Sequence, residues 1–81
     1  MDIAVELSLY PLADDYIPPI KDFIERLHRH VGVKVVTNSM STQVFGEYAT
    51  VMRALNEEIQ PTFAAGHKAV FAMKVLGPLT G

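Results

Sequence analysis

The chain begins with alternating apolar and polar side chains, the pattern of a β-strand that buries one face. Its apolar positions are Ile3, Val5, Leu7 and Leu9, and the pattern stops at Pro11. Apolar residues then recur every three or four positions, which predicts an amphipathic helix. This stripe consists of Ile17, Ile20, Phe23, Ile24, Leu27 and Val31. Gly32 follows the stripe and predicts the end of the helix.

Two acidic residues and two prolines mark the expected start of this helix. Asp14 and Asp15 stand where a capping residue and first-turn carboxylates belong. Pro18 and Pro19 are tolerated only in the first turn, where missing N–H groups cost little. The helix is therefore expected to begin just after the two aspartates.

A β-hairpin is expected next. Val33–Thr37 and Met40–Phe45 have strand composition, Asn38 and Ser39 favour a turn between them, and Gly46 ends the second strand.

A second helix and a last strand complete the pattern. The helix is indicated by Tyr48, Val51, Met52, Leu55 and Ile59. It is expected to run toward Phe63 and to close at Gly66, although Pro61 either kinks it or ends it near Ile59. Ala69–Leu76 then reads as a strand with apolar residues on both faces.

The order β-α-β-β-α-β predicts an α+β, ferredoxin-like sandwich. Right-handed crossovers place both helices on one face of a four-stranded antiparallel sheet, with the first and third strands in its middle. Met40, Thr42 and Val44 are expected to face the helices. The residues expected on the opposite, open face are Glu6, Ser8, Tyr10, Ser41, Gln43, Phe45, Val70, Ala72 and Lys74.

Length and composition favour self-association. The 81 residues are expected to form a single domain spanning 1–81, whose core is thin for its surface. Cysteine is absent, so disulfides and thiolate metal sites cannot stabilise it. Because 49% of the residues are hydrophobic, surplus apolar surface is expected to form a subunit interface in a homodimer or homotetramer.

The charge pattern excludes other partners. The net charge is −2, and the basic group Arg26, His28, Arg29 and His30 is explained by the dipole at the end of a helix. No nucleic acid is therefore expected as a partner. Apolar stretches are too short to cross a bilayer and no signal peptide pattern is present, so a cytoplasmic protein without membrane insertion is expected.

Enzyme signatures are mostly missing. The sequence contains no glycine-rich phosphate loop and no nucleophile elbow. On a helix His28 and His30 would lie about 200° apart, and His67 is distant, so all three are interpreted as surface histidines and no metal site is expected. Asp14 and Asp15 could act as paired carboxylates, but a helix cap explains them more simply.

Polar residues gather at the hairpin. Asn38, Ser39, Ser41, Thr42 and Gln43 lie in one short stretch, and its open-face members Ser41 and Gln43 are expected beside Ser8 of the neighbouring strand. Their amides and hydroxyls could bind the edge of a heterocycle. Alternatively, Asn38 and Ser39 only make the turn and Thr42 only favours a strand. Glu6 and Lys74 are expected to form a cross-strand ion pair.

Two stretches resemble the YkoF-like thiamine- and hydroxymethylpyrimidine-binding family. The segment Ser8–Pro18, SLYPLADDYIP, closely resembles the first segment of that family. The segment Ser39–Gly46, SMSTQVFG, is similar to its Ser-Thr or Gly-Thr step that ends at glycine. The resemblance implies a ferredoxin-like fold, no catalysis and no cofactor. It also implies binding of thiamine or its pyrimidine, as a carrier or sensor linked to vitamin uptake.

Better-known members of that family carry two repeats, so two copies of this chain would have to rebuild their arrangement. Tyr10, Tyr16, Tyr48 or Phe45 could stack on the cationic ligand, and Asp14, Asp15 or Glu6 could supply charge. The candidate ligand-binding residues are Ser8, Tyr10, Asp14, Asp15, Asn38, Ser41, Thr42 and Gln43.

Two alternatives stay open at this point. The chain could be a structural or regulatory homo-oligomer with a vestigial pocket, or an enzyme that uses Asp14, Asp15 or His67 as acid or base.

Overall fold

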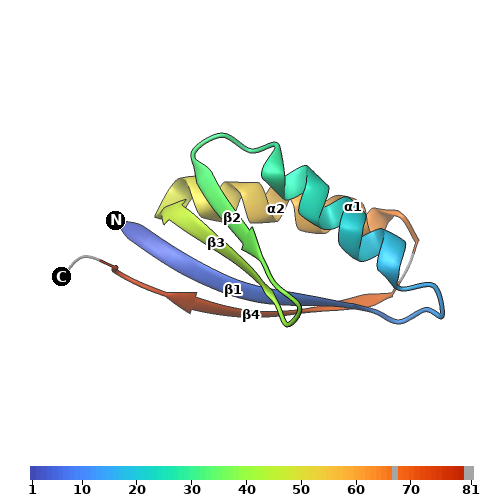
Figure 1. The fold of residues 1–81 in the computed structure, drawn as a ribbon. Helices are drawn as coiled ribbons and strands as arrows, with labels where there is room; N and C mark the ends of the chain where they lie inside the picture. Colours follow the sequence, from blue (N-terminus) through green and yellow to red (C-terminus); the bar gives the residue numbers. More distant parts are fainter. Residues whose placement is uncertain (67, 80–81) are drawn as a thin grey trace.

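The computed structural model describes residues 1–66 and 68–79, which form one sheet and two helices. The elements are β1 (Asp2–Pro11), α1 (Ile17–His28), β2 (Val33–Thr37), β3 (Thr42–Glu47), α2 (Tyr48–Ala64) and β4 (Ala69–Leu76). The strands are antiparallel in the order β2-β3-β1-β4, and both helices lie on one side of the sheet (Figure 1). The ferredoxin-like prediction, with the first and third strands in the middle, is confirmed.

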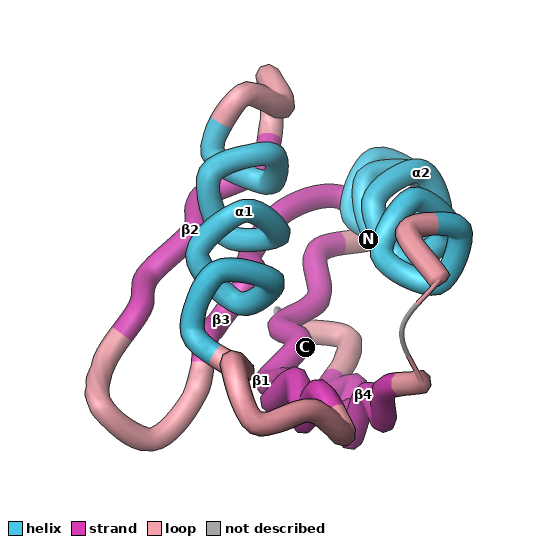
Figure 2. Tube along the Cα trace, turned by 90° about the vertical axis from the view of Figure 1, so that its right-hand side faces the viewer, coloured by secondary structure: helices cyan, strands magenta, loops and turns pink. Residues whose placement is uncertain are grey.

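The core lies between β1 and the two helices. Ile3, Val5 and Leu7 alternate toward the helices as predicted and are almost completely buried. The core residues from the other elements are Phe23, Leu27, Val44, Val51, Ala54 and Leu55. Figure 2 shows α1 and α2 side by side above the strands, so the opposite face of the sheet has no helix over it.

The edge strand β4 is apolar but largely exposed. Met73 pairs with Leu7 and Val75 pairs with Val5, so both point to the helix side of the sheet. Their exposed fractions are nevertheless 42% and 53%, because the helices leave this part of β4 uncovered. On the other face Val70 and Leu76 are also exposed. The two-sided apolar pattern was predicted correctly, but it does not mark a buried strand.

The cap predicted for α1 is wrong. The N-cap residue is Tyr16, no side chain caps the helix, and Asp14 and Asp15 lie exposed in the preceding loop. A capping side chain accepts a hydrogen bond from the N–H of the second or third helical residue. Here these residues are Pro18 and Pro19, which have no N–H to donate.

The end of α1 differs from the sequence prediction, whereas the end of α2 agrees with it. Helix α1 ends at His28, so Val31 does not extend its buried stripe and is 92% exposed. Helix α2 continues through Pro61 to Ala64, and Gly66 follows it with a positive φ of 91°. The alternative end near Ile59 is therefore not found. Within the described residues, 1–66 and 68–79, neither helix is long and apolar enough to cross a membrane.

The hairpin turn is longer than predicted. Strand β3 starts at Thr42, and Met40 is 84% exposed in the turn, so the prediction that Met40 faces the helices is wrong. The Asn38 side chain accepts hydrogen bonds from the N–H groups of Met40 and Ser41 at 2.7 and 2.9 Å. The Asn38 N–H in turn donates to the Ser41 carbonyl at 3.0 Å. These bonds hold residues 38–41 in a turn and keep them out of the strand.

Candidate ligand site

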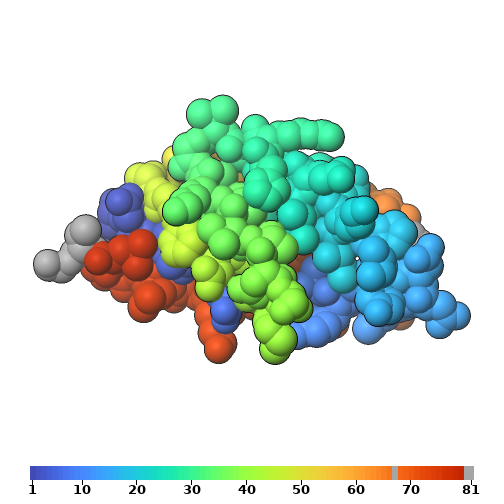
Figure 3. All heavy atoms as spheres, viewed as in Figure 1, coloured from blue at the N-terminus to red at the C-terminus, as the bar shows by residue number. Residues whose placement is uncertain are grey.

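A cavity forms where β3 has ended and β1 continues. The pairing of β1 with β3 stops at Leu7 and Thr42, whereas β1 stays paired with β4 as far as Pro11. Beyond Leu7 the free edge of β1 therefore faces the β2–β3 turn instead of a strand. This turn projects from the lower rim of the molecule beside the blue first strand (Figure 3). The space between turn, strand and α1 has a volume of about 170 Å³.

Three elements line this cavity, and each contributes a different kind of group. Helix α1 supplies the apolar side chains of Ile20, Phe23 and Ile24. Strand β1 supplies residues 7–10, and the end of β2, the turn and the start of β3 supply residues 37–42. The cavity thus combines an apolar wall with a polar rim, as small-molecule sites commonly do.

The backbone of Leu9 adds a donor and an acceptor to this cavity. Alternate residues of a strand bond to opposite neighbours. The N–H of Leu12 donates to Lys68 on the β4 side, so the N–H and C=O of Leu9, three residues earlier, are directed to the other side. On that side the strand pairing has already ended. The two backbone groups therefore face the cavity without a strand partner.

The polar side chains at the rim are already in contact with one another. The Ser8 hydroxyl donates to the Met40 carbonyl at 3.4 Å, and the Ser41 hydroxyl donates to Glu6 Oε2 at 3.2 Å. Thr42 is 6% exposed and faces the helices as predicted, with its hydroxyl 3.5 Å from that of Thr37. Ser8 and Ser41 thus tie the turn to the open face of β1, whereas Thr42 lies inside.

The structure brings five of the predicted site residues together. Ser8, Tyr10, Asn38, Ser41 and Thr42 all line the cavity. The amide oxygen of Asn38 is used to close the turn, as the alternative interpretation of this residue had it. Of the four aromatic residues considered for stacking, Tyr10 lines the cavity.

Three predicted site residues lie elsewhere. Gln43 pairs with Glu6 across the open face and lines a separate hollow of about 370 Å³ with Phe45 and Lys74. Asp15 borders a groove between the helices, near Arg26. Asp14 lies in the exposed loop before α1, outside the cavity.

The open face carries the predicted ion pair. Lys74 Nζ lies 4.0 Å from Glu6 Oε1, and the two residues are directly opposite in the register. A second hollow on this face, about 310 Å³, is lined by Glu6, Ser8 and Tyr10 together with β4 residues. Glu6 therefore stands between the cavity rim and the open face, since it also accepts the Ser41 hydrogen bond.

The two described residues suggested for acid–base chemistry, Asp14 and Asp15, lie outside the cavity. Asp14 and Asp15 are exposed in the loop, and neither forms a side-chain hydrogen bond or ion pair with another described residue. His67 lies outside the described residues.

The sequence pattern did not predict the apolar wall of the cavity or the backbone groups of Leu9 that face it. Ile20 and Ile24 belong to the predicted helical stripe, but the stripe alone does not reveal that they border a cavity. The signal that could have revealed the cavity is the difference in strand length. Strand β1 has 10 residues and β3 has 6, so the end of β1 extends past β3.

A polar network between α1 and α2 was also missed. Arg26 donates to Glu58 Oε1 at 3.0 Å and to the Thr62 hydroxyl at 2.9 Å. It lies in the last turn of α1, as the dipole interpretation requires, and is in addition packed between the helices. His30 Nε2 lies 2.6 Å from Glu58 Oε2 and is largely buried, so the surface interpretation of His30 is wrong. The 200° separation did not apply, because α1 ends at His28.

Comparisons with known proteins give one family and several similar folds. The YKOF-related Family matches residues 2–74. A protein of Thermotoga maritima, whose assignment to thiamine biosynthesis or salvage is itself provisional, has a TM-score of 0.86 at 19% identity and aligns over 100% of this chain and 88% of its own. A Streptococcus pneumoniae protein gives 0.86 at 24% identity, over 98% and 90%.

A hypothetical protein of Methanocaldococcus jannascii has a TM-score of 0.83 at 22% identity, over 99% of this chain and 84% of its own. At such identities these likenesses establish the fold alone. The comparison with curated proteins finds no match.

Proposed function

We propose, from the premise that this chain belongs to the YkoF-related family, that it binds thiamine or the hydroxymethylpyrimidine part of thiamine and does not transform it. In this proposal it acts in the cytoplasm as a carrier or sensor linked to vitamin uptake. The family match covers most of the chain, and the two segments that resemble the thiamine-binding members both contribute to the cavity.

The observation that carries the proposal is the free edge of β1 at Leu9, which faces a partly apolar cavity. The pyrimidine of thiamine has an amino group beside a ring nitrogen, so one edge presents a donor next to an acceptor. The C=O and N–H of Leu9 have the complementary order. A flat ring bound to them would lie against the apolar side chains of Ile20, Phe23 and Ile24.

The size of the cavity restricts what it can enclose. Pockets that enclose a drug-sized ligand usually measure about 300–1,000 Å³, whereas this one measures about 170 Å³. It therefore fits one heterocycle, and the positively charged thiazolium of thiamine would project past the rim. Glu6 lies at that rim through its bond to Ser41 and supplies a negative charge there. A second copy of the chain would cover the remainder.

The lining also favours an unphosphorylated ligand. In the described residues, no lysine or arginine lines the cavity, so a diphosphate group would find no cation in it. Thiamine diphosphate is therefore expected to bind more weakly than thiamine.

Titration calorimetry and thermal shift with hydroxymethylpyrimidine, thiamine and thiamine diphosphate test the proposal. A ligand at 100 times its Kd should stabilise the chain by about 2.7 kcal/mol. Hydroxymethylpyrimidine and thiamine should both do so, with thiamine diphosphate weaker. Absence of heat and of any shift with both unphosphorylated compounds would contradict the proposal. Turnover of either compound would instead favour an enzyme.

A second candidate function is a structural or regulatory homo-oligomer whose cavity no longer binds a ligand. The exposed apolar side chains of β4, Met73 and Val75 among them, favour it, because such a strand is suited to association. An oligomer that shows no response to the three compounds would support this alternative.

A further inference from the structure

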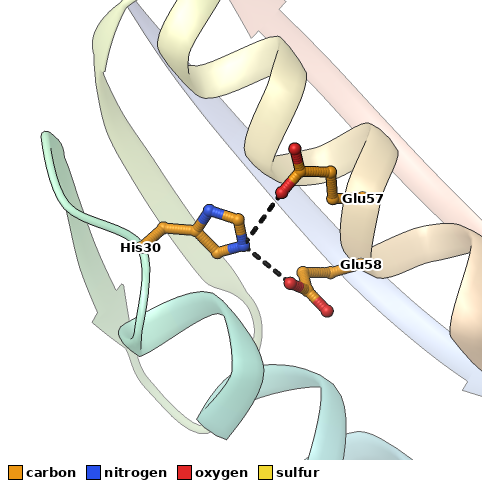
Figure 4. A group of neighbouring side chains, drawn as sticks. All are labelled: His30, Glu57 and Glu58. Atoms are coloured by element: carbon orange, nitrogen blue, oxygen red, sulfur yellow. Dashed lines mark hydrogen bonds and ion pairs between the residues drawn. The ribbon is translucent and has the colours of Figure 1, made fainter.

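A cluster of one histidine and two glutamates lies away from the cavity, where the segment after α1 meets α2. One potential ligand atom from each of His30, Glu57 and Glu58 lies within 4.8 Å of the other two. Figure 4 shows the His30 ring directed toward two carboxylates that come from adjacent positions of α2. We propose that His30, Glu57 and Glu58 bind a divalent transition-metal ion, with Zn²⁺ as the cation that suits their chemistry best.

The donor set suits such an ion. One imidazole nitrogen with two carboxylates is a combination that zinc accepts, with bonds of about 2.0–2.2 Å. Tetrahedral ligand atoms would then lie roughly 3.3 Å apart. The distances from His30 Nε2 are 2.6 Å to Glu58 and 4.0 Å to Glu57, on either side of that value. Glu57 is about half exposed and can turn toward the ion, so a small adjustment completes the geometry.

Glu58 is already oriented by its neighbours. Its Oε1 accepts a hydrogen bond from Arg26 Nη1 at 3.0 Å, while Oε2 faces His30. Arg26 also donates to the Glu58 carbonyl and to Thr62, which fixes the guanidinium. A partner that holds one carboxylate oxygen and leaves the other for the metal is the usual arrangement around bound ions.

The balance of charge points the same way. Arg26 contacts two carboxylates, since Asp22 Oδ2 lies 3.2 Å from Arg26 Nε and Glu58 Oε1 lies 3.0 Å from Arg26 Nη1. Among the described residues, Arg26 is the one permanent cation paired with Asp22, Glu57 or Glu58. Asp22, Glu57, Glu58 and Arg26 together carry a net charge of −2, the sum of three carboxylates and one guanidinium. A divalent cation would neutralise it.

The three ligands leave at least one position for water, so the affinity is expected to be moderate. An ion here would join the segment that follows α1 to α2. It would therefore stabilise the packing of the two helices, independently of the ligand cavity on the other side of α1.

The test is titration of the full chain with Zn²⁺ by calorimetry, together with melting curves and with Co²⁺ as a spectroscopic substitute. One Zn²⁺ per chain should bind and, at 100 times its Kd, raise the melting temperature by roughly 10–20 °C. Co²⁺ should show the absorption of a site with nitrogen and oxygen ligands. Glu57→Gln, an exposed position, and His30→Gln, which can still donate to Glu58, should each weaken Zn²⁺ at least tenfold.

His28→Gln, at an exposed position of the same helix end, serves as the matched control and should leave the affinity unchanged. The proposal is overturned if Zn²⁺ does not bind. It is also overturned if binding survives both Glu57→Gln and His30→Gln, or if it is lost in His28→Gln. None of these results depends on thiamine, so the outcome is separate from the proposed function.

Discussion

At the residue scale, side chains at the hairpin divide into those that build the site and those that build the turn. Ser8, Ser41 and Thr42 line one cavity, as expected from the predicted pairing of the hairpin with the first strand. The sequence pattern could not show that the side-chain oxygen of Asn38 accepts a hydrogen bond within the turn. The sequence showed that Pro18 and Pro19 lack N–H groups, but not that they occupy the second and third helical positions, whose donors a capping side chain would bind.

The pair Ser41→Ala and Thr42→Val tests whether these hydroxyls bind the ligand. Neither change opens a cavity. Each removes one neutral hydrogen bond to the ligand, which contributes about 0.5–1.5 kcal/mol to binding. Thiamine or hydroxymethylpyrimidine should therefore bind roughly tenfold more weakly in calorimetry, with the melting temperature almost unchanged. If the double variant loses stability or changes its oligomeric state while affinity falls only in proportion, the hydroxyls are structural.

Glu6→Gln is the companion variant on the same rim. It removes the charge that faces Ser41 and Lys74 but keeps the shape of the side chain. Thiamine, which is a cation, should lose affinity, whereas the uncharged hydroxymethylpyrimidine should not. If both compounds lose affinity equally, Glu6 acts by holding Ser41 in place at the cavity rim and not through its charge.

At the element scale, the sequence pattern identified the helices and strands of the described residues and the bounds of β2 and β4, but not the end of α1 or the start of β3. The end of α1 at His28 and the start of β3 at Thr42 come from local contacts that periodicity does not carry. One such contact joins the segment before β2 to β3. A Cβ atom on Gly46 would lie 2.8 Å from the Gly32 carbonyl and 3.1 Å from Val51 Cγ2. The close approach of these backbones therefore requires glycine at position 46.

Gly46→Ala is expected to destabilise the fold by about 1–3 kcal/mol, because the added methyl group must displace backbone. Urea unfolding followed by circular dichroism measures this change. Gly66→Ala is the matched control, since nothing lies within 4 Å of its Cβ position and only its positive φ opposes the change. It should cost about 1 kcal/mol. If Gly46→Ala is the milder of the two, close packing at position 46 is not the constraint.

At the scale of the whole molecule, the sheet is longer than the helices that cover it. The chain measures 43 × 22 × 16 Å along its principal axes, and the uncovered length lies along β1 and β4 (Figure 1). The hydrophobic excess in the sequence anticipated a surplus of apolar surface. It could not assign that surplus to β4, because the apolar pattern of this strand is equally typical of a buried one.

We expect light scattering at micromolar concentration to give the mass of a dimer or a larger homo-oligomer. Met73→Lys together with Val75→Lys should reduce the mass toward that of the monomer, because the charges oppose burial of the β4 surface. Since both positions are exposed in the single chain, the circular dichroism spectrum should not change. A monomeric parent chain, or an oligomer that both lysines leave intact, would contradict this role of β4.

The early end of β3 also has a consequence for exchange of backbone hydrogen with deuterium. The amide of Leu7 lies within the paired part of the sheet, whereas that of Leu9, two residues later, has no strand partner on its side. Exchange at Leu9 should therefore require far less opening and proceed much faster than exchange at Leu7. A pyrimidine bound to the Leu9 N–H would slow it selectively. This single amide would then report occupancy of the cavity from within the strand itself.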